Sequence, residues 1–243
     1  MTLLLFGLFF LFMLLGVPIA FAIGASTLYA LHQSGVPLMV VTQQMFQGIN
    51  SFALVAIPMF ILAGDLMAQG KVSEKLVSFA DSLVGFMRGG LSVVSVMAGM
   101  FFAAISGSGA ATTAAVGSSL VPELKRKGYD PASAASLIAA SGTIGVVIPP
   151  SVPMIIYAVI AQQSVSKLFL NGFLPGLAMG LGLMAIAIAQ AYKRQYPKGT
   201  PLSLATIWTT FKDASWGLMT PVIILGGIFS GIFTPSEAAV VAV

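Results

Sequence analysis

Small hydroxyl residues and glycines gather in one short stretch of an otherwise apolar chain. The stretch reads Ser106-Gly107-Ser108-Gly109-Ala110-Ala111-Thr112-Thr113. Its glycines and serines interrupt a helix, so it predicts a turn at which one helix ends and another begins. The carbonyls that end the first helix carry a partial negative charge that suits a cation, and the amides that start the second suit an anionic group. We therefore predict an ion or substrate site here.

Hydroxyl groups add to this prediction because hard cations such as Na⁺ prefer oxygen ligands. The stretch offers the hydroxyls of Ser106, Ser108, Thr112 and Thr113. Close packing is the alternative interpretation, since small residues that recur every four positions let two helices approach each other. The residues of that face are Ser106, Ala110, Ala114 and Ser118. The two interpretations are compatible, and the sequence leaves both open.

A second break is predicted within residues 142–151. Three prolines, Pro149, Pro150 and Pro153, fall within five residues. Proline cannot continue an α-helix because it lacks an N–H and clashes with the preceding turn. An unwound stretch leaves carbonyls without helical partners, and a bound cation is one possible partner. The alternative is a proline kink whose carbonyls are satisfied by neighbouring helices. The candidate binding residues are the four hydroxyl residues with Gly107, Gly109, Gly142, Thr143, Pro149, Pro150 and Ser151.

The composition indicates a membrane protein. Hydrophobic residues make up 58% of the 243 residues, charged residues make up 7%, and the mean hydropathy is +1.00. A soluble domain of this length carries far more charge. The 11 basic residues stand in short segments between apolar runs, a pattern that orients a membrane protein and does not form a nucleic-acid surface. We expect an all-α protein that crosses the bilayer several times and has no nucleic-acid partner.

Missing residue types exclude several kinds of chemistry. With no cysteine and one histidine, His32, the chain can form no disulfide, thiolate metal site or multi-histidine site. It has no G-x-x-x-x-G-K-[ST] motif, so it does not power transport with an ATPase of its own. Residues 106–109 have a superficial likeness to a nucleophile loop, but no partner base accompanies them. We therefore expect neither an enzyme nor a resident cofactor.

The chemically interesting stretch lies within a charge-free run of 34 residues, 89–122, that has basic residues at both ends. One straight helix of that length would be about 50 Å long, against a hydrocarbon core of about 30 Å, and two crossings would need about 40 residues. Positive charge favours the cytoplasmic side. The run therefore predicts a re-entrant helical hairpin that enters from the cytoplasm and turns inside the bilayer, where non-helical backbone must be buried in protein or line a cavity.

Other elements are expected from apolar runs and prolines. Spans are predicted at residues 2–31 (kinked at Pro18), 51–69, 168–192 and 217–233, and a broken crossing at 131–166. Helices in the membrane surface are predicted at 38–50, 71–88 and 203–216, and a basic loop at 122–130. We divide the chain into scaffold-type spans 1–70, an interfacial helix 71–88, a transport-type segment 89–166, a span with a second amphipathic helix 167–216, and 217–243 as the start of a second repeat.

Counting crossings supports this topology. With a cytoplasmic N-terminus, ten basic residues fall in the cytoplasm and only Lys167 lies outside. Asp65 is followed six residues later by Lys71, so we expect it at the interface and not as an intramembrane proton carrier. Glu237 belongs to Thr234-Pro235-Ser236-Glu237, the capping-box pattern that begins a helix.

Several of these motifs together resemble the large membrane subunit of tripartite ATP-independent periplasmic (TRAP) transporters. They are the stretch 106–113 within its hairpin, Pro122-Glu123-Leu124, Asp130-Pro131, Ile148-Pro149-Pro150-Ser151 and Thr234-Pro235-Ser236-Glu237-Ala238-Ala239. The resemblance covers essentially the whole chain. It implies a secondary transporter of the bacterial inner membrane, driven by a Na⁺ gradient, which takes an organic anion such as a C4-dicarboxylate or sialic acid from a periplasmic binding protein. A small four-helix membrane subunit is the implied partner.

The resemblance also implies an inverted-repeat fold that moves as an elevator, with sodium sites at hairpin tips and paired broken helices, here 106–113 and 142–151. Family members are longer than this chain, so we expect only the first repeat and the start of the second, and no transport by the chain alone. An anion symporter that needs no binding protein and a non-transporting scaffold subunit are the alternative functions.

Overall fold

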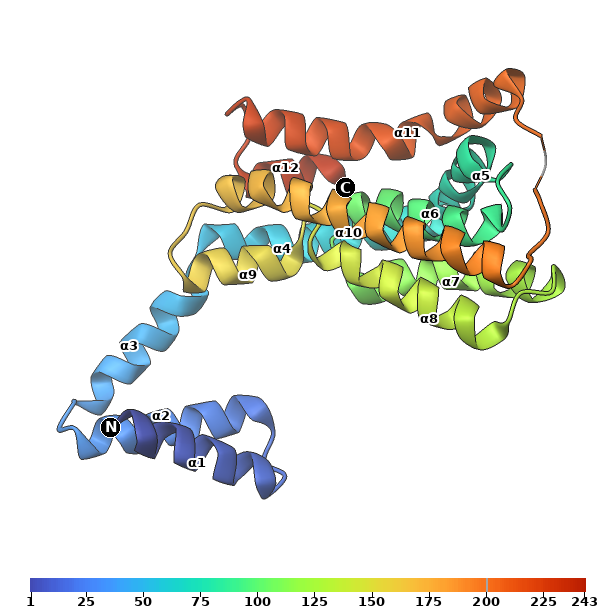
Figure 1. Ribbon diagram of the computed structural model, residues 1–243. Coiled ribbons are helices and arrows are strands. Elements are labelled where there is room, and N and C mark those ends of the chain that lie inside the picture. Colours follow the sequence, from blue (N-terminus) through green and yellow to red (C-terminus); the bar gives the residue numbers. More distant parts are fainter. Residues whose placement is uncertain (200) are drawn as a thin grey trace. The chain divides into compact units, whose positions relative to one another are not determined.

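Helices account for the regular structure of the chain (Figure 1). The computed structural model describes residues 1–199 and 201–243, and within them there is no β-strand, only one isolated bridge. The elements are α1 (Thr2–Leu14), α2 (Ile19–Gln33), α3 (Leu38–Ile49), η1 (Phe52–Val55), α4 (Ala56–Gln69), α5 (Val72–Val84), α6 (Gly90–Ser106), α7 (Gly109–Arg126), α8 (Pro131–Thr143), η2 (Ile144–Val146), α9 (Val152–Ile160), α10 (Val165–Lys193), α11 (Leu204–Phe229) and α12 (Pro235–Ala242). The all-α prediction is confirmed.

Local capping chemistry determines where many helices begin. Six of them follow a residue whose side-chain oxygen accepts a backbone N–H of the first turn: Ser108, Asp130, Ser151, Ser164, Ser203 and Thr234. The predicted capping box is present, because the Glu237 carboxylate accepts the Thr234 N–H at 2.8 Å while the Thr234 hydroxyl accepts the Glu237 N–H. The structural interpretation of Glu237 is therefore confirmed.

Contacts divide the chain into two units, residues 1–51 and 52–243. In the first unit, the single kinked span predicted for residues 2–31 is wrong, because the chain forms two helices, α1 and α2, that contact each other. Gly16 has a left-handed φ of +79°, and Pro18 cannot donate a helical hydrogen bond, so the first helix ends before both. At 13 residues, α1 is about 20 Å long, shorter than a hydrocarbon core. The amphipathic segment 38–50 is helical as predicted.

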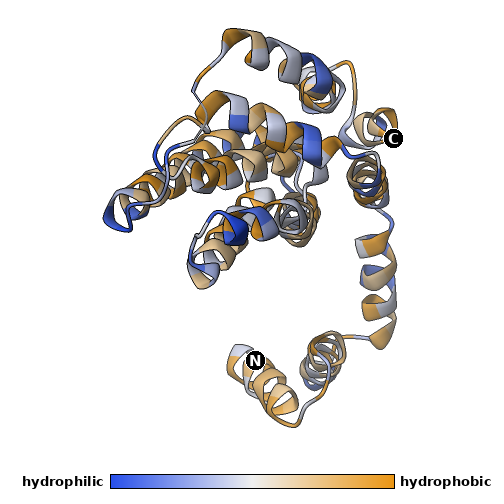
Figure 2. Ribbon diagram, turned by 90° about the vertical axis from the view of Figure 1, so that its right-hand side faces the viewer, coloured by the Kyte–Doolittle hydropathy of each residue, from blue (hydrophilic) through white to orange (hydrophobic). Residues whose placement is uncertain are grey.

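In the second unit, α6 and α7 form a helical hairpin, since they contact each other and are joined by Gly107 and Ser108 (Figure 1). Its re-entry into a membrane stays a prediction. The first arm is the centre of the unit, since 13 of its 17 residues are buried. The second arm runs further than expected. Pro122 lies inside α7, which continues to Arg126, so the basic loop predicted at 122–130 is mostly helix. Hydrophobic residues run along most of the helices of the chain (Figure 2).

The amphipathic helix α5 packs on protein. Its apolar stripe was predicted to lie in the membrane surface, but Leu76 is fully buried in a core shared with α6, and Phe79 stacks on Phe101 with ring centroids 5.8 Å apart. The ring centroids of Phe79 and of Phe211 in α11 lie 5.6 Å apart. Helix α11 is continuous from Leu204 to Phe229, so the amphipathic helix and the separate crossing predicted for 203–233 are one helix. Helices α6 and α11 therefore cover the middle of the stripe, where Leu76 is buried and Phe79 is half-buried, while Phe86 at its end is exposed.

Within residues 1–199 and 201–243, two helical stretches are long and apolar enough to cross a membrane, Phe52–Gln69 and Val165–Lys193. Both correspond to predicted spans, and the second begins three residues earlier than expected because Ser164 caps it. The break predicted within residues 142–151 is also present, since α8 ends at Thr143, a 3₁₀ turn follows, and α9 begins at Val152. The membrane crossing by this segment stays a prediction.

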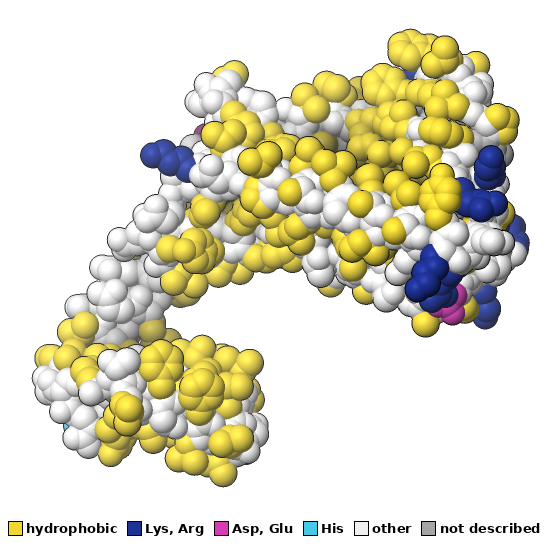
Figure 3. Space-filling view, viewed as in Figure 1, with side chains coloured by type: hydrophobic (Ala, Val, Ile, Leu, Met, Phe, Trp, Pro, Cys, Tyr) yellow, Lys and Arg dark blue, Asp and Glu magenta, His cyan; other side chains and the backbone are white. Residues whose placement is uncertain are grey.

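Basic residues from distant segments meet at the base of the hairpin. The Arg194 guanidinium lies 2.9 Å from the Asp130 carboxylate, joining the end of α10 to the loop after α7. The rings of Tyr129 and Tyr196 lie 4.2 Å apart beside this ion pair. Most Lys and Arg side chains visible on the face in Figure 3 gather at this end of the second unit. The grouping agrees with the predicted topology, and the membrane side it faces stays a prediction.

Candidate functional site

The two breaks predicted from the sequence meet in space. The Val152 N–H, which starts α9, donates to the carbonyl of Gly107 at the hairpin tip at 3.2 Å. Gly107 has a left-handed φ of +60°, and a Cβ at this position would lie 2.5 Å from the carbonyl oxygen of Pro150. Glycine is therefore required here both by the backbone conformation and by the close approach of the proline segment. The tip is held directly against the break.

A small group of oxygens is buried inside the tip. The hydroxyls of Ser106 and Thr112 lie 3.1 Å apart, and Thr112 Oγ1 donates to the carbonyl of Ser108 at 2.8 Å. Ser106 is 2% exposed and Thr112 is fully buried. We call Ser106 Oγ, Ser108 O and Thr112 Oγ1 the tip oxygens. They come from the end of one helix, the turn and the first turn of the next helix, which is the arrangement that the sequence predicted.

The other two predicted hydroxyls have different surroundings. Ser108 Oγ accepts the Ala111 N–H at 3.3 Å, so it caps α7. Thr113 Oγ1 donates to the Gly109 carbonyl at 2.9 Å and lies against Gly142, where a Cβ would overlap it. The structure thus brings Ser106 and Thr112 together with the Ser108 carbonyl, and it places the Thr113 hydroxyl at the contact between α7 and α8.

The proline break is built from buried residues. Pro149, Pro150 and Ser151 are buried, and Ser151 Oγ donates to the Val146 carbonyl at 2.6 Å while capping α9 through the Met154 N–H. One carbonyl freed by the break is therefore satisfied within the segment. Thr143 differs, because its side chain is exposed and its hydroxyl donates to the Ala140 carbonyl at 2.7 Å.

An open hollow of about 750 Å³ lies beside the tip. Its wall includes Gly109, Ala110, Thr113 and Ala114 from α7, Ala139, Gly142 and Thr143 from α8, Val146 and Val147 from the break, and Met179 from α10. No charged side chain is among these residues. The first turn of α7 contributes to the wall, so the amides at that helix start lie beside the hollow.

The small-residue packing face differs from the one predicted. Ala110, Ala114 and Ser118 are exposed in the structure, and only Ser106 of that set packs closely, against Gly64 of α4. The face that contacts α8 is displaced by one residue: Gly109 approaches the Gly142 carbonyl, and Gly117 approaches Ile138. Close packing is thus a property of this hairpin, but it uses the row that begins at Gly109.

Three site neighbours were not predicted from the sequence. A Cβ on Gly145 would lie 2.9 Å from Thr112 Oγ1, one on Gly64 would lie 3.2 Å from Ser106 Cα, and Ser141 fills the space beside Gly99. The sequence contained a signal for Ser141 and Gly145, because both are small residues at the end of an otherwise helical run. Gly64 had no such signal, since its contact joins segments 42 residues apart.

Family comparison decides what kind of protein carries this site. Residues 6–243 match the family model described as the tripartite ATP-independent periplasmic transporter, DctM component. The chain belongs to this TRAP transporter family. The predicted resemblance is confirmed, and the interrupted helices described above belong to a member of this family.

Similar TRAP permeases come from several bacteria. The isethionate TRAP transporter permease protein DctMQ of Oleidesulfovibrio alaskensis is 46% identical over 98% of this chain and 38% of its own length. The C4-dicarboxylate TRAP transporter large permease proteins DctM of Rhodobacter capsulatus and Vibrio cholerae are 39% and 43% identical, over 98% and 95% of this chain and 58% and 51% of their own lengths. The chain thus spans about half the length of these relatives.

Proposed function

We propose that this chain forms part of the large permease subunit of a Na⁺-coupled secondary transporter that imports an organic anion. The observation that carries the proposal is the contact between the hairpin tip and the proline break, which surrounds buried oxygens with two interrupted helices. In transporters, discontinuous helices of this kind bind ions through freed carbonyls and anionic groups through helix starts. Family membership supports the same conclusion.

The coupling ion would bind at the tip oxygens. Ser108 O accepts from the Thr112 hydroxyl, and either hydroxyl of the Ser106–Thr112 pair can donate to the other, so both protons can rotate away from an arriving cation. Gly64 and Gly145 pack against Ser106 and Thr112 and limit the space around these oxygens. A cation held here needs no carboxylate, which agrees with the uncharged wall of the neighbouring hollow.

The substrate would be a small organic acid that lies in the hollow beside the start of α7. Two of the relatives reported above are named for C4-dicarboxylates and one for isethionate, a sulfonate. These compounds share negatively charged oxygen groups. The partial positive charge at the start of α7 favours such a group. The choice among these acids, or of sialic acid, depends on side chains that would face the hollow from a second repeat.

The remaining expectations complete the proposal. The permease would lie in the bacterial inner membrane with its hairpin re-entering from the cytoplasm and its N-terminus cytoplasmic, and it would move as an elevator. Its partners would be a small four-helix membrane subunit and a periplasmic binding protein that delivers the anion. Residues 89–166 would form the transport-type segment.

Uptake by the assembled transporter in proteoliposomes, with the Na⁺ concentration varied, tests this function. We expect Thr112→Ala to raise the Na⁺ concentration for half-maximal uptake roughly tenfold, the effect of losing one interaction of about 1.4 kcal/mol. Thr112→Ser keeps the oxygen and should stay near the unmodified protein. Ser118→Ala, an exposed hydroxyl on the same helix, is the matched control.

Uptake that does not depend on Na⁺ would defeat the proposal. The ion site would also be wrong if Thr112→Ala lowered the amount of folded protein and left the Na⁺ dependence of the remainder unchanged. That result would support the packing interpretation of the hairpin tip.

A further inference from the structure

Two cations face each other at the base of the hairpin, at the end opposite the tip. Arg88 and Lys198 form an antiparallel bridge, in which the Gly89 N–H donates to the Pro197 carbonyl at 2.9 Å and the Gly199 N–H to the Met87 carbonyl at 3.4 Å. Side chains directly opposite in such a pair start about 4.5–5.5 Å apart, and like charges in these positions destabilise the pairing. The arrangement therefore favours an anion between them.

Neither cation has an acidic partner among the described residues. The ion pairs in that part of the chain join Glu123 to Arg126 and Lys127, and Asp130 to Arg194. The Asp130 carboxylate is engaged twice, because the Ser133 backbone N–H and Arg194 both lower its pKa. It is thus committed to its own helix cap and to Arg194.

The Arg88 guanidinium carries a buried donor with no acceptor. Its Nε is inaccessible to solvent, and no hydrogen-bond acceptor in residues 1–199 or 201–243 reaches it. Buried polar atoms in folded proteins nearly always have a partner, and a buried donor without one costs about 1–3 kcal/mol. Since Nε is closed to solvent, a ligand would bind the other N–H groups of this guanidinium.

A cavity of about 560 Å³ lies in front of the two cations. Its lining is Phe86, Met87, Arg88, Tyr192 and Lys198, with no acidic residue. Phe86 is 43% exposed and Tyr192 is 63% exposed, so the charged pocket has an aromatic border. Tyr192 belongs to the last turn of α10, one of the two helices long and apolar enough to span a membrane. Tyrosine favours the membrane–water boundary, where its ring is in apolar surroundings and its hydroxyl is wet.

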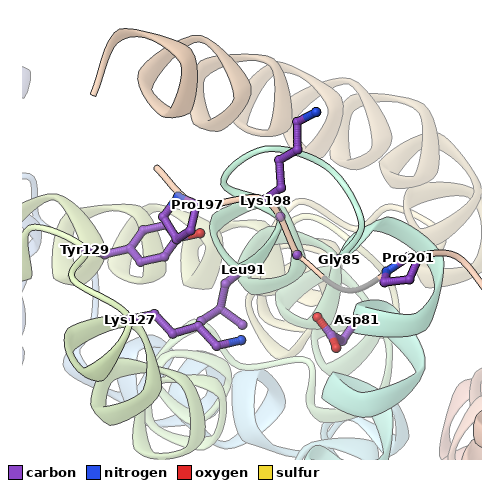
Figure 4. Close-up of a pocket in the computed structure, with 10 residues that line it drawn as sticks. Asp81, Gly85, Leu91, Lys127, Tyr129, Pro197, Lys198 and Pro201 are labelled. Carbon is purple, nitrogen blue, oxygen red and sulfur yellow. The ribbon is translucent and has the colours of Figure 1, made fainter. Parts of the chain in front are cut away.

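The adjacent cavity does not compete for this role. It is lined by Asp81, Lys127 and Tyr129 together with Lys198, but the Lys198 side chain points away from Asp81 (Figure 4). Burial raises the pKa of Asp81, and Lys127 is the cation that opposes this rise. Positive and negative charge are thus balanced in that cavity, whereas the cavity at Arg88 is only positive.

We propose that Arg88 and Lys198 bind the phosphate group of an anionic phospholipid at the end of α10. A guanidinium and an ammonium on one phosphate form charge-assisted hydrogen bonds, and the ligand would relieve the like-charge repulsion between them. Free phosphate shares this chemistry, but Phe86 and Tyr192 favour a ligand whose anionic group is attached to an apolar body. The site does not depend on the transport function proposed above.

Native mass spectrometry of the assembled permease in detergent tests the site, with phosphatidylglycerol, phosphatidylcholine or inorganic phosphate added separately. We expect phosphatidylglycerol to be retained most strongly, and Lys198→Gln to weaken its retention about tenfold. Lys125→Gln removes an exposed cation from the same end of the second unit and should change retention little. Equal retention by both variants, or binding of inorganic phosphate without a preference for the lipid, would overturn the proposal.

A second measurement keeps the test valid if lipid retention changes through misfolding. In lipid-free detergent, Lys198→Gln removes a like-charge repulsion, so its thermal midpoint should equal or exceed that of the unmodified protein. Phosphatidylglycerol should then raise the midpoint of the unmodified protein and have little effect on the variant. A lower midpoint for the variant in lipid-free detergent, or the same lipid-induced rise in both proteins, contradicts the site.

Discussion

Close backbone contacts determine which residues the hairpin tip can accept. Gly107 combines a left-handed conformation with the nearby Pro150 carbonyl, whereas Gly142 is restricted only by its neighbours across the helix contact. At Gly142, a Cβ would overlap the Thr113 hydroxyl and lie 2.9 Å from the Gly109 carbonyl oxygen. A backbone oxygen cannot rotate away, so this helix contact would have to open to admit even one methyl group.

Gly142→Ala should therefore destabilise the protein by about 1–3 kcal/mol, the usual cost of an added methyl group in a tight core. The free energy of unfolding, from denaturant titration in detergent micelles, measures this effect. Gly182→Ala on α10 is the matched control, because no heavy atom lies within 4 Å of its added Cβ. Adding Thr113→Ala should recover part of the loss. A Gly142→Ala variant as stable as the Gly182→Ala variant would mean that α7 and α8 are not in close contact.

At the scale of elements, helix α5 shows how an amphipathic pattern acquires its partner. An apolar stripe on a charged helix fits a membrane surface and a protein surface equally well, because both supply apolar contact. Here α6 and α11 supply it, and the Ser82 and Thr210 hydroxyls lie 2.9 Å apart across the contact between α5 and α11. The middle of the stripe thus packs on the protein core.

A disulfide between Ser82→Cys and Thr210→Cys should form readily under mild oxidation. The chain has no native cysteine, so the cross-link is unambiguous. Mass spectrometry of the oxidised protein measures its yield. Ser82→Cys with Thr209→Cys is the control, because Thr209 is exposed and one residue further around the helix. If α5 instead lay in the membrane surface away from α11, both pairs would cross-link equally poorly.

On the scale of the whole molecule, the distribution of charge is the feature that orients the chain. The bridge between Arg88 and Lys198 and the ion pair between Arg194 and Asp130 hold the base of the hairpin to the segment that follows α10. Lys167 belongs to the first turn of α10, and Arg194 directly follows its last residue, so nearly the whole 29-residue helix separates them. That separation is about 40 Å, enough to put the two residues on opposite sides of a bilayer.

Thiol labelling of intact cells and inverted vesicles should reproduce this separation. Cysteines at Lys127 and Arg194 should react from the cytoplasm, and a cysteine at Lys167 from the periplasm. The reason is that the first two positions lie at the hairpin base and the third at the far end of α10. Labelling of Lys127→Cys and Lys167→Cys from the same side would refute the broken crossing at 131–166 and the crossing by α10 together.

Composition and local pattern alone determined that this is an all-α, membrane-type chain with two broken segments and a capped final helix, and its motifs carried the resemblance to the TRAP family. Those features depend on residue type and short spacing: prolines remove donors, glycines end helices, and serines, threonines and Asp130 cap the helices that follow. Two wrong local predictions concerned prolines, because a proline can lie either at the end of a helix or inside one. Pro18 lies at a helix boundary where a kinked span was expected, while Pro122 lies inside a continuous helix where a loop was expected.

Only the tertiary structure decided which segments meet. It placed Gly107 against the proline break, selected Ser106 and Thr112 from four hydroxyl residues, covered the α5 stripe with α11, and set Arg88 opposite Lys198. The physical reason is that each of these contacts joins residues whose separation along the chain leaves no periodic signal. Close approach depends on the positions of whole helices, and those positions are fixed by packing that no short window of sequence contains.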